Sequence, residues 1–272
     1  LCTAFGTAGT GGFGIKSDSM AGYSTYLQVV ITVFMILFGI NFNAYFLLIT
    51  RKFAQAFKME EVRYYLGIIA IAVLIITCNI YHMYGSVSES LQQAAFQVGS
   101  IITTTGYATT DFNLWPEISR TILVMLMFVG ACAGSTGGGI KVSRILILCK
   151  TIRKELHIFL HPNAVKKIKM DGKVIPHEVL RSTNIFIIVY MLIFAGSIFL
   201  IAFDDFDLIT NFTAVTATFN NIGPGLELVG PIGNFGMFSW FSKIVLTFDM
   251  LAGRLEIFPL LLLFVRDTWK KF

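Results

Sequence analysis

The chain has 272 residues, of which 55% are hydrophobic and only 14% are charged, and its mean hydropathy is +0.73. A soluble domain carries about a quarter charged residues, so this composition excludes an ordinary soluble protein and indicates a polytopic α-helical membrane protein. The formal net charge is +5, and the basic residues gather in Arg51–Arg63, Lys141–Arg181 and the tail from Arg266. Lys and Arg are enriched in cytoplasmic loops, so we expect these three regions and the C-terminus to face the cytoplasm.

Apolar runs recur along the chain, and a helix of about 20 apolar residues crosses a bilayer. In chain order we predict membrane segments at Tyr26–Leu48, Leu66–Tyr84, Ile118–Val129 with a continuation to Leu148, Thr183–Ala202 and Phe238–Phe264. Ser88–Ile102 and Leu208–Phe219 are shorter, and we predict that they are pore helices that enter the membrane and turn back.

Gly- and Thr-rich loops lie at Thr10–Gly14, Thr103–Tyr107 and Asn220–Gly225, and each contains a glycine followed by a ring-bearing residue. We interpret the pattern as a repeat of helix, pore helix, loop and return helix. The domains are then 1–63 (the loop and return helix of a second unit), 64–177 (a third unit) and 178–272 (a fourth unit). The chain opens in such a loop without an initiator Met, so we expect a first unit upstream.

The chemistry of these loops suits a dehydrated cation. Backbone carbonyls can replace the hydration shell of an ion, glycine lets the backbone turn them inward, and threonine adds hydroxyl oxygen without charge. The alternative is that the three loops are ordinary turns between helices. The recurrence of the loops at equivalent positions disfavours that alternative. The predicted ion-binding residues are Thr10, Gly11, Gly12, Phe13, Thr104, Thr105, Gly106, Tyr107, Asn221, Ile222, Gly223 and Pro224.

A second glycine-rich stretch, Gly134–Lys141, lies inside the apolar run that follows the middle loop. It differs from a phosphate-binding loop, which requires Gly-Lys-Ser/Thr after its spacer, because Ile140 separates Gly139 from Lys141. Several glycines weaken a helix, so we predict a helix break, with close helix packing as the alternative.

Arg254 is a charge within an apolar segment, which costs about 2.5–3.5 kcal/mol on insertion scales and indicates a wet cavity or a partner. On a continuous helix its neighbours four residues away are Met250 and Phe258, which offer no carboxylate. We therefore expect a partner on another helix, or a position in the pore.

Four stretches resemble the Trk/Ktr/HKT family of potassium transporters, most of all the bacterial Trk membrane (pore) subunit. They are Ile101–Phe112, Gly130–Lys141, Phe219–Gly225 and Leu251–Ile257. The resemblance implies four units around a single pore, potassium bound at the loops, and a location in the cytoplasmic (inner) membrane. It also implies an intramembrane gate at Gly134, Ser135, Thr136, Gly137, Gly138, Gly139 and Lys141, with Arg254 in the pore below the loops.

The same resemblance implies a homodimer in the lipid bilayer and cytoplasmic nucleotide-binding regulatory subunits. Sodium or mixed conduction in the same fold is an alternative, and a secondary transporter with broken helices is a second one. That second class has inverted repeats, whereas these units run in one direction. We expect no enzyme activity, no nucleic-acid partner and no transition-metal site, although His157 and His161 are spaced like metal ligands.

Overall fold

The computed structural model describes residues 1–16, 18–163, 166–255 and 257–270, and helices dominate it. The helices are α1 (Cys2–Ala8), α2 (Thr25–Phe38), α3 (Phe42–Ile49), α4 (Phe53–Lys58), α5 (Glu60–Tyr84), α6 (Val87–Ile102), α7 (Glu117–Val129), α8 (Val142–Leu160), α9 (His177–Ile201), α10 (Leu208–Phe219), α11 (Trp240–Arg254) and α12 (Ile257–Leu262). Short 3-10 helices cover Phe112–Leu114, Ala202–Asp204, Glu227–Val229, Phe235–Met237 and Arg266–Trp269. Strands β1 (Lys169–Met170) and β2 (Lys173–Val174) form an antiparallel hairpin.

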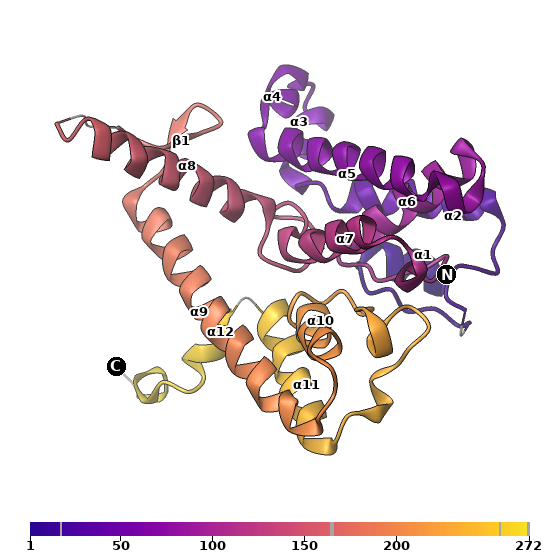
Figure 1. Cartoon of the computed structure of the whole chain (residues 1–272). Coiled ribbons are helices and arrows are strands. Elements are labelled where there is room, and N and C mark those ends of the chain that lie inside the picture. The colour runs from indigo at the N-terminus through magenta and orange to yellow at the C-terminus, as the bar shows by residue number, and fades with distance from the viewer. Residues whose placement is uncertain (17, 164–165, 256, 271–272) are drawn as a thin grey trace.

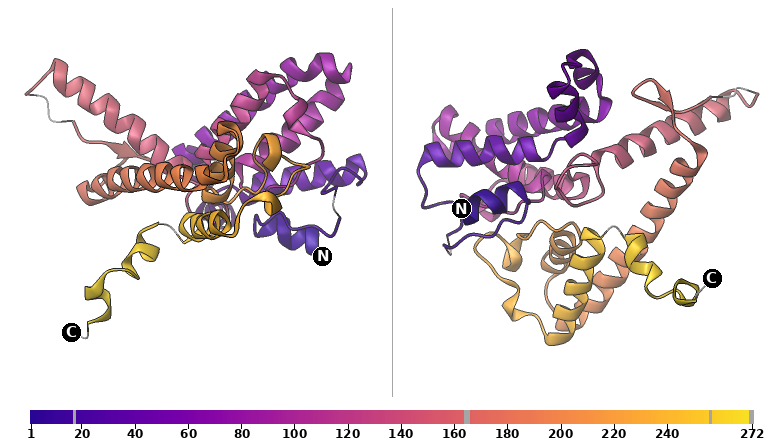
Figure 2. Two further views of the ribbon diagram at one scale, coloured as in Figure 1. Left: turned by 60° about the horizontal axis from the view of Figure 1, so that its bottom comes forward. Right: turned by 180° about the vertical axis from the view of Figure 1, so that it is seen from behind.

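The helices gather in two packed groups (Figure 1). Helices α5, α6 and α7 share a core that includes Tyr65, Ile101 and Leu123, whereas α9, α10 and α11 share a second core that includes Phe194 and Phe219. Helix α8 leads out of the first group and projects away from both, as the two views of Figure 2 also show.

Among the described residues, two helices are by themselves long and apolar enough to cross a membrane. Helix α5 has a mean hydropathy of 2.1 and the segment His177–Asp204 one of 2.8. Helix α5 ends at Gly85, whose φ of 65° places it in the left-handed region that favours glycine. The predicted spans at Leu66–Tyr84 and Thr183–Ala202 are confirmed, and both helices begin several residues earlier than predicted.

The predicted return helix Tyr26–Leu48 is broken, because α2 and α3 meet at an angle of 90°, although the two together are long and apolar enough to form one span. The Asn41 side chain accepts a hydrogen bond from the backbone N–H of Asn43 at 2.9 Å and so starts a new helix. The Tyr65 hydroxyl donates to Ile36 O at 3.1 Å beside the bend. A single polar residue in an apolar run therefore turns the chain.

The predicted segment Phe238–Phe264 is also divided. The Ser239 side chain accepts from Ser242 N and starts α11, and α11 ends at Arg254. Helix α12 starts at Ile257, and Glu256 lies outside the described residues.

Both predicted pore helices are present. Helix α6 begins at Val87, one residue before the predicted start, and α10 has the predicted bounds. Helix α10 is capped by Asp207, whose side chain accepts from Thr210 N at 2.9 Å. Hydrogen bonds from Thr210 lower the pKa of the Asp207 carboxyl.

The basic region Lys141–Arg181 is mostly structured. It contains α8, the β1–β2 hairpin and the start of α9. Apolar residues recur in α8 at helical spacing between the charges, a pattern that favours a helix. Lys150 Nζ donates to Lys169 O at 2.7 Å and so holds the hairpin against α8.

Candidate functional site

Three loops follow α1, α6 and α10, and we call them loop 1 (Thr10–Phe13), loop 2 (Thr104–Tyr107) and loop 3 (Asn221–Pro224). They share one hydrogen-bond pattern, in which the second and third residues of the loop both donate to a carbonyl in the last turn of the preceding helix. The bonds are Gly11 and Gly12 N to Gly6 O at 2.8 and 3.4 Å, Thr105 and Gly106 N to Ser100 O at 2.9 and 3.3 Å, and Ile222 and Gly223 N to Ala217 O at 2.8 and 3.5 Å. The repeat inferred from sequence is thus reproduced in the backbone.

The loops also share their backbone angles. The first and third residues of each have positive φ: Thr10 49° and Gly12 65°, Thr104 57° and Gly106 84°, Asn221 57° and Gly223 109°. A left-handed backbone costs a non-glycine residue about 1–2 kcal/mol. The same unfavourable conformation at three equivalent positions indicates that the surroundings impose it, as they do at functional sites.

The loops lie against one another in chain order. A Cβ atom added at Gly12 would lie 1.9 Å from Thr105 O, and one added at Gly106 would lie 1.9 Å from Ile222 O. A Cβ added at Gly223 would meet no described atom within 4 Å. Gly12 and Gly106 therefore each pack on a carbonyl of the next loop, and the corresponding side of loop 3 is open.

Loop 2 is braced on both sides. The Tyr107 hydroxyl donates to Phe13 O of loop 1 at 3.1 Å, and the Ser100 hydroxyl donates to Tyr107 O at 2.6 Å. The predicted residues of the three loops thus form one constellation. A cavity of about 770 Å³ borders it, lined by loops 1 and 3, α11 and Arg254.

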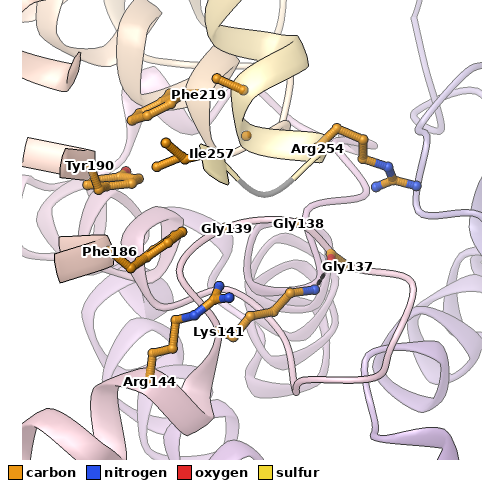
Figure 3. Close-up of a pocket in the computed structure, with 12 residues that line it drawn as sticks. Gly137, Gly138, Gly139, Lys141, Arg144, Phe186, Tyr190, Phe219, Arg254 and Ile257 are labelled. Atoms are coloured by element: carbon orange, nitrogen blue, oxygen red, sulfur yellow. Dashed lines mark hydrogen bonds between the residues drawn. The ribbon is translucent and has the colours of Figure 1, made fainter. Parts of the chain in front are cut away.

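The predicted helix break is present and is longer than predicted, because residues 130–141 separate α7 from α8. We call residues 130–141 the glycine-rich loop. Gly130 has a φ of 70° and Lys141 one of 79°, so both ends of the loop turn in the left-handed region. Figure 3 shows its glycines Gly137–Gly139 between Arg254 and the aromatic side chains of α9.

The glycine-rich loop contacts the other loops directly. Gly138 N donates to Thr104 Oγ1 at 2.7 Å, and Thr10 Oγ1 donates to Thr136 O at 2.9 Å. A Cβ at Gly137 would lie 2.6 Å from the Ala131 Cβ, and one at Gly138 would lie 2.9 Å from Asn220 O. The close approach requires glycine here, and Lys141 Nζ also donates to Gly137 O within the loop.

Arg254 is the last residue of α11 rather than a residue inside a longer helix. Its two terminal nitrogens donate to Thr136 O and to Gly9 O, each at 3.2 Å. Within the described ranges no carboxylate pairs with it, and its partners are two backbone carbonyls outside the helices rather than a group on another helix. The guanidinium joins the glycine-rich loop to the residue that precedes loop 1.

Sequence reasoning missed two supports of loop 3. The Tyr190 hydroxyl donates to Asn220 Oδ1 at 3.0 Å, and Asn220 Nδ2 donates to Thr216 O at 2.9 Å. Asn220 is fully buried. An Asn beside a second Asn at the end of a pore helix was the only signal, and nothing in the sequence connects it to a tyrosine in α9.

Long apolar helices, broken helices and three adjoining re-entrant loops define a helical membrane transporter built from pore-loop units. The chain belongs to the TrkH family, described as cation transport protein, whose sequence profile matches residues 1–271. It is 36% identical to the Trk system potassium uptake protein TrkH of Salmonella typhimurium and 32% identical to TrkG of Escherichia coli. The first match covers 98% of this chain and 56% of the relative.

A solved structure agrees with this placement. The crystal structure of the potassium transporter TrkH from Vibrio parahaemolyticus superposes with a TM-score of 0.87 at 35% identity, over 98% of this chain and 58% of that one. The predicted family and fold class are therefore confirmed. The chain spans a little over half the length of these relatives.

Proposed function

We propose that the chain forms part of a potassium-uptake pore, in which loops 1, 2 and 3 bind the dehydrated ion. The observation that carries this proposal is the shared backbone of the three loops together with the contacts of Gly12 and Gly106 with neighbouring carbonyls. Alternation of positive and negative φ along a loop turns successive carbonyls to one side, which is what an ion-selecting loop needs. The negative ends of α6 and α10 also lie at the loops and favour a cation.

The unit boundaries 1–63, 64–177 and 178–272 remain our interpretation of the repeat. The open side of Gly223 supports a further loop of the same kind in the complete pore. Potassium is favoured because the relatives are named for it. Sodium or mixed conduction remains the alternative for this site, and the common direction of the units disfavours a secondary transporter with inverted repeats.

The test is uptake by a bacterial strain that lacks its own potassium-uptake systems. The full-length protein that contains this chain should restore growth at low potassium, and purified protein in liposomes should conduct potassium in preference to sodium. Equal fluxes of the two ions would support the sodium or mixed alternative, and no flux of either would refute conduction.

We further propose that the glycine-rich loop is a gate that closes the path below the loops. Gly137→Ala combined with Gly138→Ala should raise potassium flux about tenfold, because the added methyl groups clash with Ala131 and Asn220 O and drive the loop out of its place. The potassium-to-sodium ratio should stay the same, since selection occurs where the ion is dehydrated. Liposome flux measures both quantities.

The matched control is Gly196→Ala, in α9, where an added Cβ meets no described atom within 4 Å. It should leave flux unchanged. If the double variant also conducts like the wild type, the glycine-rich loop is a packing contact between helices and the gate is withdrawn.

We place the protein in the inner membrane with its basic regions in the cytoplasm, as a homodimer with nucleotide-binding regulatory subunits. Six basic residues of α8 and the β1 region gather around a hollow of about 170 Å³: Lys150, Arg153, Lys154, Lys166, Lys167 and Lys169. We expect neutralisation of these residues, together with Lys270, to weaken capture of a soluble partner in a pull-down with the full-length protein. Neutralising Lys16, which lies over the Tyr23 ring, is the control. Undiminished capture would contradict the assignment.

A further inference from the structure

Glu61 is a carboxylate buried where the sequence offers no reason for one. It lies in the first turn of α5 and only 4% of its surface is exposed. In the part of the chain that the structure describes, no Lys or Arg forms a salt bridge with it. A buried charge without a cation is costly unless hydrogen bonds satisfy it, so its hydrogen-bond partners decide its role.

Those partners lie at two breaks in the fold. One oxygen, Oε1, accepts from Ala133 N at 2.6 Å and from Ser143 N at 3.2 Å. The other, Oε2, accepts from Asn41 Nδ2 at 3.3 Å. Ala133 lies in the glycine-rich loop, Ser143 in the first turn of α8, and Asn41 at the bend between α2 and α3. One side chain thus joins the loop to the start of α8 and to the bend between α2 and α3.

Helix α8 depends on this contact at its start. Its N-cap residue, Lys141, makes no side-chain capping bond, and the first N–H groups of a helix need acceptors. Glu61 supplies one from another helix, and its negative charge suits the positive end of the α8 dipole. Because α8 begins where the glycine-rich loop ends, holding this end restricts the loop.

The loop is tied to the bend as well. Phe42 N donates to Gly134 O at 3.0 Å and Cys132 N donates to Gly39 O at 3.0 Å. The first turn of α5 is itself fixed from the other side, because Glu60 pairs with Lys150 of α8 and Glu60 N donates to Asp171 Oδ1 at 2.7 Å. Glu61 therefore projects from a fixed turn into the base of the loop.

We propose that Glu61 is a positioning residue that holds the glycine-rich loop in its place beneath loops 1 and 2. The proposal rests on the proposed conduction through those loops. Loss of the carboxylate removes the hydrogen bonds to Ala133 and to the start of α8. The glycine-rich loop then moves out of the ion path below loops 1 and 2 more often. Glu61 touches no permeating ion, so it affects how often the path is open and not which ion passes.

The test compares Glu61→Gln, Glu61→Asp and wild type in the full-length protein reconstituted in liposomes. Glu61→Gln keeps the size of the side chain and removes its charge. Potassium flux should rise about tenfold, since a hydrogen bond to a charged group contributes roughly a factor of ten or more to an equilibrium. The potassium-to-sodium ratio should not change, and Glu61→Asp should give a smaller rise. Glu178→Gln, an exposed carboxylate in the first turn of α9, is the matched control and should match wild type.

A second measurement does not depend on conduction. Cys132 is buried beside the carboxylate, while Cys2, Cys78 and Cys149 are exposed. With the three exposed cysteines replaced by serine, alkylation of Cys132 by a maleimide should be faster in Glu61→Gln than in wild type or Glu178→Gln. Wild-type flux and wild-type alkylation in both Glu61 variants would overturn the proposal, as would a lowered ion ratio in the folded Glu61→Asp variant. If wild type itself carries no potassium, the proposed function fails, and the alkylation rates still decide the role of Glu61.

Discussion

Gly106→Ala is expected to reduce potassium flux at least about 100-fold. The new Cβ would lie 1.9 Å from Ile222 O, so loops 2 and 3 must separate by roughly 1 Å, and a misplacement of that size costs about 100-fold at a site that depends on position. The φ of 84° at this residue adds strain for any residue with a side chain. Flux through liposomes, with protein content measured in parallel, records the loss.

Gly223→Ala tests the further loop proposed beside loop 3. Gly223 has a φ of 109°, and an added Cβ there meets no described atom within 4 Å, so this variant clashes only if another loop packs on Gly223 in the complete pore. A loss of flux as large as in Gly106→Ala would support that loop, and a smaller loss would leave backbone strain as the cause. Flux in Gly106→Ala equal to wild type would show that the contact between loops 2 and 3 has no part in conduction.

Arg254→Ala is expected to raise potassium flux about tenfold and to leave the potassium-to-sodium ratio unchanged. A positive charge about 7 Å from a permeating cation repels it by roughly 2 kcal/mol at an effective dielectric near 20. Removing the guanidinium also deletes its bonds to Thr136 O and Gly9 O, which join the glycine-rich loop to loop 1. Both changes favour passage, and a guanidinium offers no oxygen for ion selection.

Arg254→Lys separates the effect of the charge from the effect of the two hydrogen bonds. Lysine keeps the charge but lacks the planar fork that reaches two carbonyls, so we expect a flux between those of wild type and Arg254→Ala. Arg181→Ala, which removes an exposed charge from the first turns of α9, is the control and should match wild type. A fall in flux with a less stable Arg254→Ala protein would mean that Arg254 is mainly a structural tie.

The pore helices and loops could be predicted because their signals are local. The length of the apolar run predicted the bounds of α10. The pattern of a glycine followed by a ring-bearing residue identified Gly12, Gly106 and Gly223. Glycine concentration also indicated the break before α8. These features depend on backbone freedom and hydrophobicity, which a single sequence displays directly.

The bends and the partners of buried polar groups could not be predicted in the same way. Asn41 caps α3 at the bend after α2, yet an Asn within an apolar run also fits an unbroken helix. Glu61 lies among the charges of the basic region Arg51–Arg63, and its acceptor role depends on Ala133 and Ser143, which are far away in the sequence. Arg254 was predicted to lie within a longer apolar segment, whereas it is the last residue of α11. The apolar pattern gave no sign that the helix ends there.

Loops 1, 2 and 3 should hold the dehydrated ion. Anomalous diffraction from crystals of the full-length protein grown in rubidium, which substitutes for potassium, locates that ion. We expect anomalous peaks beside the carbonyls of Thr105 and Ile222 that weaken when excess potassium, but not excess sodium, is added to the same crystals. Peaks that all lie away from the three loops, or peaks at the loops that potassium does not weaken, would show that the loops are not the potassium site.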